Sequence, residues 1–230
     1  MKTIIIFLII FLISITGNTG LYSVDIKSQL PSNIFKFQNE KVPLDCYNQL
    51  INKPSAIKIR IFQNKIDNIP ILNVLFDFHV VYKLPIDQLF SKVLNLNEEQ
   101  KIFPRIIYSK DLNPEDGLWK PHFQEIKTQF TFSFYKENFN YIFYKIPIQN
   151  SDGSFLIKWN LYDSVDEKFL YNYGSWYMEE IIIDNQKYTY IRNYINYGMK
   201  KYHFYTELAT NIGGANEPIS FFNALKKATQ

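Results

Sequence analysis

The chain of 230 residues is 47% hydrophobic and 17% aromatic, and it carries a formal net charge of +3. A chain of this length can bury one substantial hydrophobic core. Charges of both signs are interspersed, and no cluster of Lys and Arg is interleaved with aromatic residues, so we expect no nucleic-acid partner. Cys46 is the only cysteine in the sequence, which excludes an intramolecular disulfide and a cysteine-rich metal site.

The N-terminus has the form of a secretory signal peptide. In MKTIIIFLIIFLISITGNTG, Lys2 precedes an apolar run from Ile4 to Ile15, and small or polar residues follow. The alternative is a transmembrane anchor, but a bilayer span needs about 20 apolar residues and this run is shorter. We therefore predict a signal peptide at residues 1–20, cleaved after Gly17 or Gly20, and a single domain at residues 21–230. Such a protein is exported, to the periplasm or to the outside of the cell.

The spacing of apolar residues predicts both helices and strands in the first half of the domain. Val42–Ile51 has the spacing of a short helix. Apolar residues then recur at every second position in two segments, Ile57–Ile61 and Val74–Tyr82, which predicts two strands. The next segment, LPIDQLFSKVLNL, carries one apolar stripe and begins with Pro85, a residue favoured in the first turn of a helix. We therefore predict a short helix after the second strand.

The second half of the domain is predicted to form strands followed by a helical C-terminal segment. The segments with extended character are FPRIIYSKDL, Phe130–Phe134, Phe139–Ile148, Phe155–Leu161 and a hairpin over Tyr173–Gly198. The C-terminal residues have helical spacing over Glu207–Ile212 and Ile219–Lys227, with Gly213, Gly214 and Pro218 between them. This order indicates an α+β domain with several antiparallel strands and a terminal helix.

Hydrophobic patterns near both ends of the domain are similar to those of a known superfamily. VLFDFHVVYKLPIDQLFSKVLNLNEEQKIFPRI resembles the strand, Pro-led helix and following segment of START-like (SRPBCC) lipid-transfer domains. YGSWYMEEI, KYTYIRNYINYG and the helix after them resemble the final hairpin and closing helix of that superfamily, which also contains polyketide cyclases and plant pathogenesis-related allergens. The resemblance spans Ile57–Lys227. It departs at the closing helix, which is usually continuous and is interrupted here by the glycine pair and Pro218.

The resemblance implies a helix-grip fold, in which a curved antiparallel β-sheet wraps around a C-terminal helix. It also implies a cavity between the sheet and that helix, holding a lipid, a sterol or another apolar ligand, and transient membrane contact. We therefore expect a non-catalytic carrier of an apolar small molecule. Two alternatives stay open: a cyclase- or hydrolase-like enzyme on the same fold, in which polar groups converge in the cavity, and an interaction module with a filled core.

The hairpin over Tyr173–Gly198 decides which side chains face the cavity. A turn centred on Asn185-Gln186 pairs Glu179 with Arg192 across the strands, on a face that suits solvent. The opposite face is the better candidate for the cavity side, and it carries Trp176, Met178, Glu180, Ile182, Thr189, Ile191, Asn193 and Ile195. A one-residue shift of the turn would instead bring Tyr190, Arg192 and Tyr194 inward, which suits an anionic head group.

Ten residues on the inward faces of the strands are our predicted cavity-lining, ligand-binding residues: Phe76, Phe78, Phe132, Phe134, Trp159, Trp176, Met178, Glu180, Ile191 and Asn193. Glu180 and Asn193 are polar positions on an otherwise apolar wall, where an unsatisfied group costs about 1–3 kcal/mol. They would bind a ligand head group or an ordered water. Alternatively, Glu180 lies at the rim in water or meets a lysine of the closing helix.

No motif in the sequence predicts catalysis, a metal site or a cofactor. His79, His122 and His203 lack the spacing of metal ligands, and we expect each to be a surface or hydrogen-bonded side chain. The sequence contains no GxSxG, no HExxH and no Gly-rich phosphate loop in the required context. The enzyme hypothesis therefore depends on dispersed polar residues alone.

Overall fold

The computed structural model describes residues 46–114, 117–132, 135–200, 202, 206, 210 and 216–230. All of them fall within one compact unit. The predicted signal peptide lies outside the described residues, and so do Gly213 and Gly214. Among the described residues, no helix is both long enough and apolar enough to cross a bilayer.

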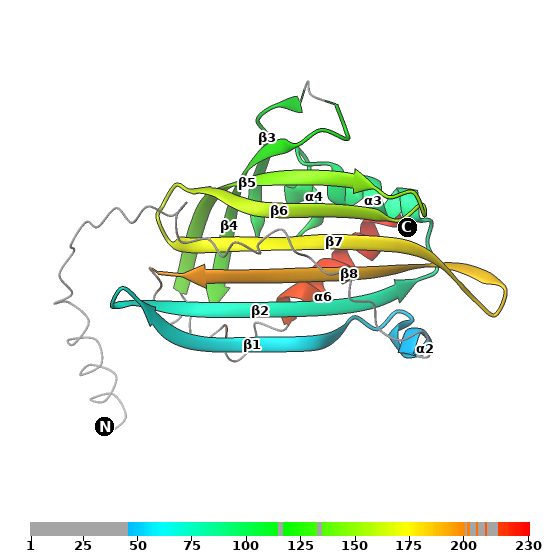
Figure 1. The fold of residues 1–230 in the computed structure, drawn as a ribbon, viewed down its shortest axis with the longest axis horizontal. Helices are drawn as coiled ribbons and strands as arrows, with labels where there is room; N and C mark the ends of the chain where they lie inside the picture. Colours follow the sequence, from blue (N-terminus) through cyan, green and yellow to red (C-terminus); the bar gives the residue numbers. More distant parts are fainter. Residues whose placement is uncertain are drawn as a thin grey trace. The chain divides into compact units, whose positions relative to one another are not determined.

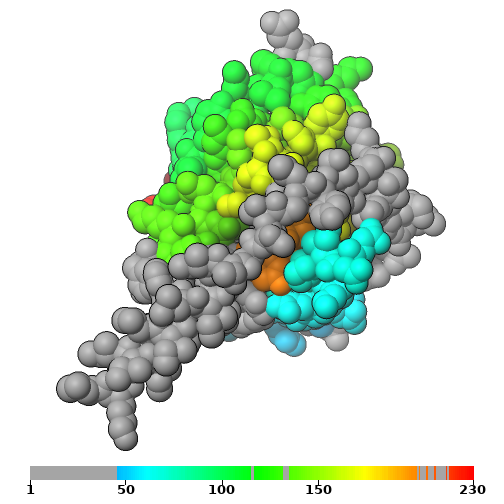
Figure 2. All heavy atoms as spheres, turned by 90° about the vertical axis from the view of Figure 1, so that its left-hand side faces the viewer, coloured from blue at the N-terminus to red at the C-terminus, as the bar shows by residue number. Residues whose placement is uncertain are grey.

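The described elements form one large antiparallel sheet with helices packed against it. In chain order they are α2 (Tyr47–Leu50), β1 (Ser55–Ile66), β2 (Ile69–Tyr82), α3 (Ile86–Leu94), α4 (Glu99–Ile102), β3 (Ile106–Asp111), β4 (His122–Phe132), β5 (Tyr135–Gln149), β6 (Phe155–Ser164), β7 (Phe169–Ile183), β8 (Gln186–Met199) and α6 (Asn216–Thr229). The eight strands lie in the order β1-β2-β8-β7-β6-β5-β4-β3. In the end-on view of Figure 2, the cyan, orange, yellow and green surfaces follow this order.

The sheet curves around α3, α4 and α6, which lie on its concave face (Figure 1). The main core forms there, where Leu89 of α3 and Phe222 and Leu225 of α6 belong to one buried cluster with inward strand residues. Pro218 lies in the first turn of α6, where a missing backbone N–H leaves no hydrogen bond unmade. Pro218 therefore belongs to the start of α6, which corrects its predicted place before the helix. The large curved antiparallel sheet and the C-terminal helix fit the predicted helix-grip fold.

The β7–β8 hairpin has a different register from the predicted one. Its turn residues are Asp184 and Asn185, with φ of 49° and 58°, and Ile183 pairs with Gln186. Asp and Asn tolerate this left-handed conformation better than Gln does, so a two-residue turn forms on them. The turn centre moves by one residue, which shifts the cross-strand pairing by two. Our expectation that such a shift would bring Tyr190, Arg192 and Tyr194 inward is therefore wrong. A two-residue shift preserves the faces of both strands, and Tyr177, in place of Glu179, pairs with Arg192.

The convex face of the hairpin is largely buried, which corrects our expectation that it suits solvent. Tyr177 and Tyr190 pack with Tyr47 of α2 in a second, smaller cluster. Arg192 is 5% exposed, and its Nε donates to Asp77 Oδ1 at 2.8 Å.

His79 belongs to the same buried network on β2. It lies on the outward face, as its alternation predicted, but it is only 2% exposed. Its Nδ1 lies 2.5 Å from the Tyr190 hydroxyl, and its Nε2 lies 3.1 Å from Asp77 Oδ1. Burial acts to raise the pKa of Asp77, but the hydrogen bonds from His79 and Arg192 outweigh it and hold that pKa below its ordinary value.

Candidate functional site

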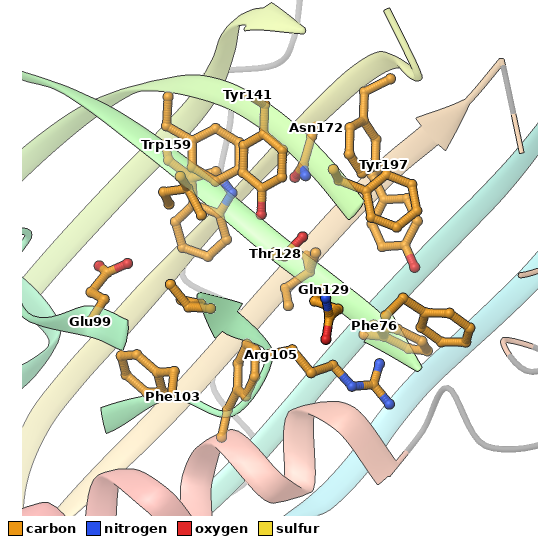
Figure 3. Close-up of a pocket in the computed structure, with 18 of the residues that line it drawn as sticks. Phe76, Glu99, Phe103, Arg105, Thr128, Gln129, Tyr141, Trp159, Asn172 and Tyr197 are labelled. Atoms are coloured by element: carbon orange, nitrogen blue, oxygen red, sulfur yellow. The ribbon is translucent and has the colours of Figure 1, made fainter. Parts of the chain in front are cut away.

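A cavity of about 380 Å³ lies between the concave face of the sheet and the helices α4 and α6 (Figure 3). Most of its wall is aromatic or aliphatic, and the rings come from six strands, the residue after α4, and α6: Phe76, Phe103, Phe130, Phe139, Tyr141, Phe143, Trp159, Phe169, Trp176, Tyr197 and Phe221. Thr131 and Asn216 also line it, and both are exposed. The cavity therefore reaches the surface between the end of β4 and the start of α6.

One row of residues, paired from strand to strand across five strands, forms the middle of the cavity wall. Lys145 of β5 pairs with Trp159 of β6, and Trp159 pairs with Gly174 of β7. The row continues through Ile195 of β8 to Phe76 of β2. Gly174 matters because a Cβ at this position would overlap the Trp159 indole and the backbone oxygen of Tyr194. The indole therefore lies over the glycine and forms part of the cavity wall.

Four of the ten predicted residues line the cavity: Phe76, Trp159, Trp176 and Asn193. They lie on β2, β6, β7 and β8 with the face assignment expected from alternation. Trp176 also stacks on Phe103, the residue after α4, at 6.2 Å, and it meets Phe222 of α6 edge-on at 5.4 Å. The structure thus brings these four residues together at one site.

The other six predicted residues have different positions. Phe78, Met178 and Ile191 are fully buried in the concave-side core, away from the cavity. Glu180 lies outside the cavity and is exposed, and its carboxylate pairs with Lys187 at 2.8 Å. It meets water and a lysine of its own hairpin because the strand has passed the edge of the core there. Phe132 is the last residue of β4, and the structure describes its backbone but not its side chain. Phe134 lies outside the described residues.

A buried ion pair lies at the wall of the cavity. Lys145 Nζ donates to Glu99 Oε1 at 2.8 Å, and the side chains are only 7% and 5% exposed. A buried charge is tolerated when a charge of opposite sign lies this close, because an unpaired charge in an apolar medium costs several kcal/mol. The pair therefore places two charged groups against a mostly apolar cavity and joins β5 to the start of α4.

Side-chain hydrogen bonds fix the segment that carries Glu99. Gln124 Nε2 donates to the Leu96 backbone oxygen at 3.0 Å and to Ser109 Oγ at 2.7 Å. The Asn97 side chain accepts a hydrogen bond from the backbone N–H of Asp111. These bonds anchor the connection between α3 and α4 to strands β3 and β4, so that Glu99 meets Lys145.

Arg105 lines the cavity on the side of β4. Its φ is 73°, a conformation that is uncommon for a residue with a side chain and that recurs at ligand sites. The guanidinium carbon lies 5.1 Å from the centroid of the Phe130 ring, which is within the range of a cation–π contact. The backbone N–H of Gln129 donates to the Arg105 carbonyl at 2.8 Å, and Figure 3 shows both side chains at the cavity.

Solved structures of lipid-transfer proteins are similar to this chain. A STAR-related lipid transfer protein from Xanthomonas axonopodis matches with a TM-score of 0.52 and 12% identity, over 74% of this chain and 98% of its own. Human StAR-related lipid transfer protein 5 matches with a TM-score of 0.56 and 8% identity, over 74% of this chain and 86% of its own. The chain has a START-like fold. No family model matches the sequence, and no curated protein matches it.

Sequence reasoning missed several polar residues of this START-like cavity, although two of them carry a signal. Lys145 continues the alternation of Tyr141 and Phe143, so a charged residue occupies an inward phase. Asn172 likewise lies on the phase of Trp176. Glu99 shows no such signal, because its place at the cavity depends on a contact with a distant strand.

The described residues contain no group of three or more His, Cys, Asp or Glu side chains that could hold a metal ion. His122 is buried and lies close to one acid only, with Nδ1 2.9 Å from Asp111 Oδ2. His203 lies outside the described residues.

Proposed function

We propose that this chain binds an apolar small molecule, a lipid or sterol among the candidates, in the cavity between sheet and α6, and carries it. The observation that carries the proposal is the cavity itself. Its volume of about 380 Å³ is within the range of small-molecule sites, which are mostly apolar with a few placed polar groups. The START-like fold and the names of the similar lipid-transfer proteins support it.

Carriage of such a ligand requires transient contact with a membrane, and two exposed apolar side chains support this part of the proposal. Leu118 and Trp119 are 55% and 43% exposed in the connection between β3 and β4. Trp119 is held in place by stacking on Phe90 at 5.6 Å. A tryptophan anchored in this way is suited to the interface of a bilayer. Binding to phosphatidylcholine vesicles, lost in Trp119→Ala, tests this step.

Export is the third part of the proposal, and the Lys2 and Ile4–Ile15 pattern supports it. Fractionation of the native cells and N-terminal sequencing of the mature protein test it. A mature N-terminus at residue 18 or 21 is the expected result. A protein that keeps Met1 and stays inside the cell would contradict export without affecting the cavity.

Two measurements test ligand binding directly. The first is lipid extraction of the protein purified from its native source, followed by mass spectrometry, in which we expect one enriched lipid or sterol. The second is the uptake of phenylnaphthylamine, an apolar probe whose fluorescence rises in an apolar cavity.

A matched pair of variants locates the uptake. Ile195 lines the cavity, whereas Ile182 of the same hairpin is 62% exposed. Ile195→Trp should fill part of the cavity and lower probe uptake, and Ile182→Trp should leave it unchanged. Overpacking at Ile195 also lowers stability by about 1–3 kcal/mol, so uptake is compared at a temperature where both variants are folded. No enriched lipid together with no probe uptake would refute the proposal and favour an interaction module.

A further inference from the structure

One amide in the cavity wall has a buried oxygen without a hydrogen-bond partner. Asn172 of β7 lines the cavity and is 7% exposed. Its Oδ1 is buried and accepts no hydrogen bond. Figure 3 shows its amide directed into the cavity between Tyr141 and Tyr197.

Aromatic rings gather on this part of the wall. Phe169 lies between the two tyrosines, with ring centroids 5.4 Å from Tyr141 and 5.7 Å from Tyr197. Asn172 Oδ1 accepts no hydrogen bond from the hydroxyls of these tyrosines or from any other described residue, so burial of this oxygen costs free energy. A buried polar group that the fold leaves unpaired is a candidate for pairing with a ligand.

The other unpaired amide of the cavity is a weaker candidate. Asn193 Oδ1 also lacks a partner, but Asn193 is only 1% exposed, and its Nδ2 already faces the Ser175 backbone oxygen at 3.5 Å. Asn172 has more contact with the open space. Its position among rings also leaves room beside it for an apolar skeleton.

We propose that Asn172 recognises a hydrogen-bond donor on the ligand, so that the cavity selects apolar molecules that carry a hydroxyl group. The hydroxyl donates to Oδ1 and can accept from Nδ2 of the same amide. The proposal rests on the ligand-binding function proposed above and specifies the ligand class. A site that pairs a buried amide with a hydroxyl rejects an analogue lacking the donor, because the amide then stays unpaired.

The test uses two isomers that differ in the donor. Dodecanol and undecyl methyl ether have the same molecular formula, but only dodecanol has an O–H group. Each is titrated against bound phenylnaphthylamine, and the ratio of the ether's Kd to the alcohol's Kd is compared between proteins. We expect this ratio to fall about tenfold, which is about 1.4 kcal/mol, when Asn172 is replaced by Leu. Comparing proteins removes the difference in solubility between the isomers.

Asn160 gives the matched control. Its Oδ1 is also buried without a partner, but it lies on β6 outside the cavity lining, so Asn160→Leu should keep the wild-type ratio. If Asn172→Leu is insoluble, Asn172→Ala removes the amide without adding bulk.

The outcomes separate this inference from the function on which it rests. Probe uptake with equal ratios in wild type and the Asn172 variant would overturn the inference and leave ligand binding intact. Absence of probe uptake by the wild-type protein would overturn both. A ratio that falls equally in Asn160→Leu would show a general effect of amide removal and would also overturn the inference.

Discussion

The ion pair at the cavity wall gives the sharpest prediction about stability. Lys145→Met removes the ammonium group and keeps a side chain of similar length. It leaves the Glu99 carboxylate 5% exposed without the cation that Lys145 supplies at 2.8 Å. Removal of one member of a buried pair costs about 3–5 kcal/mol, because the remaining charge is unpaired in an apolar environment. We expect Lys145→Met to lower the free energy of unfolding by that amount.

The double variant separates the unpaired charge from the lost contact. Glu99→Gln together with Lys145→Met removes both charges, and replacement of both members of a buried pair is often close to neutral. The double variant should therefore recover most of the stability that Lys145→Met loses. An unpaired carboxylate also draws water into the cavity, so Lys145→Met should weaken phenylnaphthylamine uptake more than the double variant does.

Urea denaturation at pH 7 measures the free energy of unfolding of the wild type, of Lys145→Met and of the double variant. Lys101→Met is the matched control. Lys101 pairs with Glu98 at 2.6 Å, but the two side chains are 66% and 45% exposed, and water screens such a pair. Lys101→Met should leave stability unchanged within error. The reasoning fails if Lys145→Met costs no more than Lys101→Met, or if the double variant is as unstable as Lys145→Met.

Four further substitutions test the cavity wall, the packing outside the cavity and the convex face. Trp159→Ala should alter probe uptake and cost clearly less than the core range of about 3–5 kcal/mol, because the open cavity borders Trp159. Phe90→Ala loses a ring stack on a phenylalanine at 4.4 Å outside the cavity, so it should cost the full core range and leave probe uptake unchanged. If urea melts and probe titrations show the core cost for Trp159→Ala and altered uptake for Phe90→Ala instead, the cavity assignment is wrong. Gly174→Ala should displace the Trp159 indole, seen as a changed tryptophan emission spectrum, and an unchanged spectrum counts against the overlap. The lowered pKa of Asp77 means that its carboxylate stabilises the fold above pH 3.8, its ordinary pKa, and that this stabilisation is lost as the pH falls below that value. The free energy of unfolding should therefore fall less steeply with falling pH in Asp77→Asn than in the wild type. Equal slopes would rule this out.

Strand faces could be predicted from the sequence more reliably than register. Alternation placed Trp176 and Asn193 on the concave face, and the structure has them there. The predicted turn centre was one residue too far along the chain, because the sequence offers four consecutive polar residues from Asp184 to Lys187. The faces were preserved only because moving the turn centre by one residue shifts the pairing by two. Burial of Arg192 was not predictable, since it depends on Asp77 in a strand more than 100 residues away in sequence.

The sequence predicted only part of the candidate site, because the pattern of apolar residues carries no information about contacts between distant segments. Hydrophobic alternation identifies the inward face of a strand but does not say what covers that face at each point along it. Asn172 was missed although it shares the phase of Trp176, because the predicted hairpin began at Tyr173. Glu99 could not be assigned, since only the three-dimensional fold brings α4 next to Lys145.

The length of α6 explains why the inward residues divide between core and cavity. A helix of 14 residues is about 21 Å long, whereas the 15 residues of β7 extend over about 50 Å. The helix is therefore less than half as long as β7. Phe222 and Leu225 belong to the same buried core as Met178, while Phe221 lines the cavity. Asn172, six residues before Met178 on the same face, lies about 20 Å farther along the strand, where that face lines the cavity instead of the core.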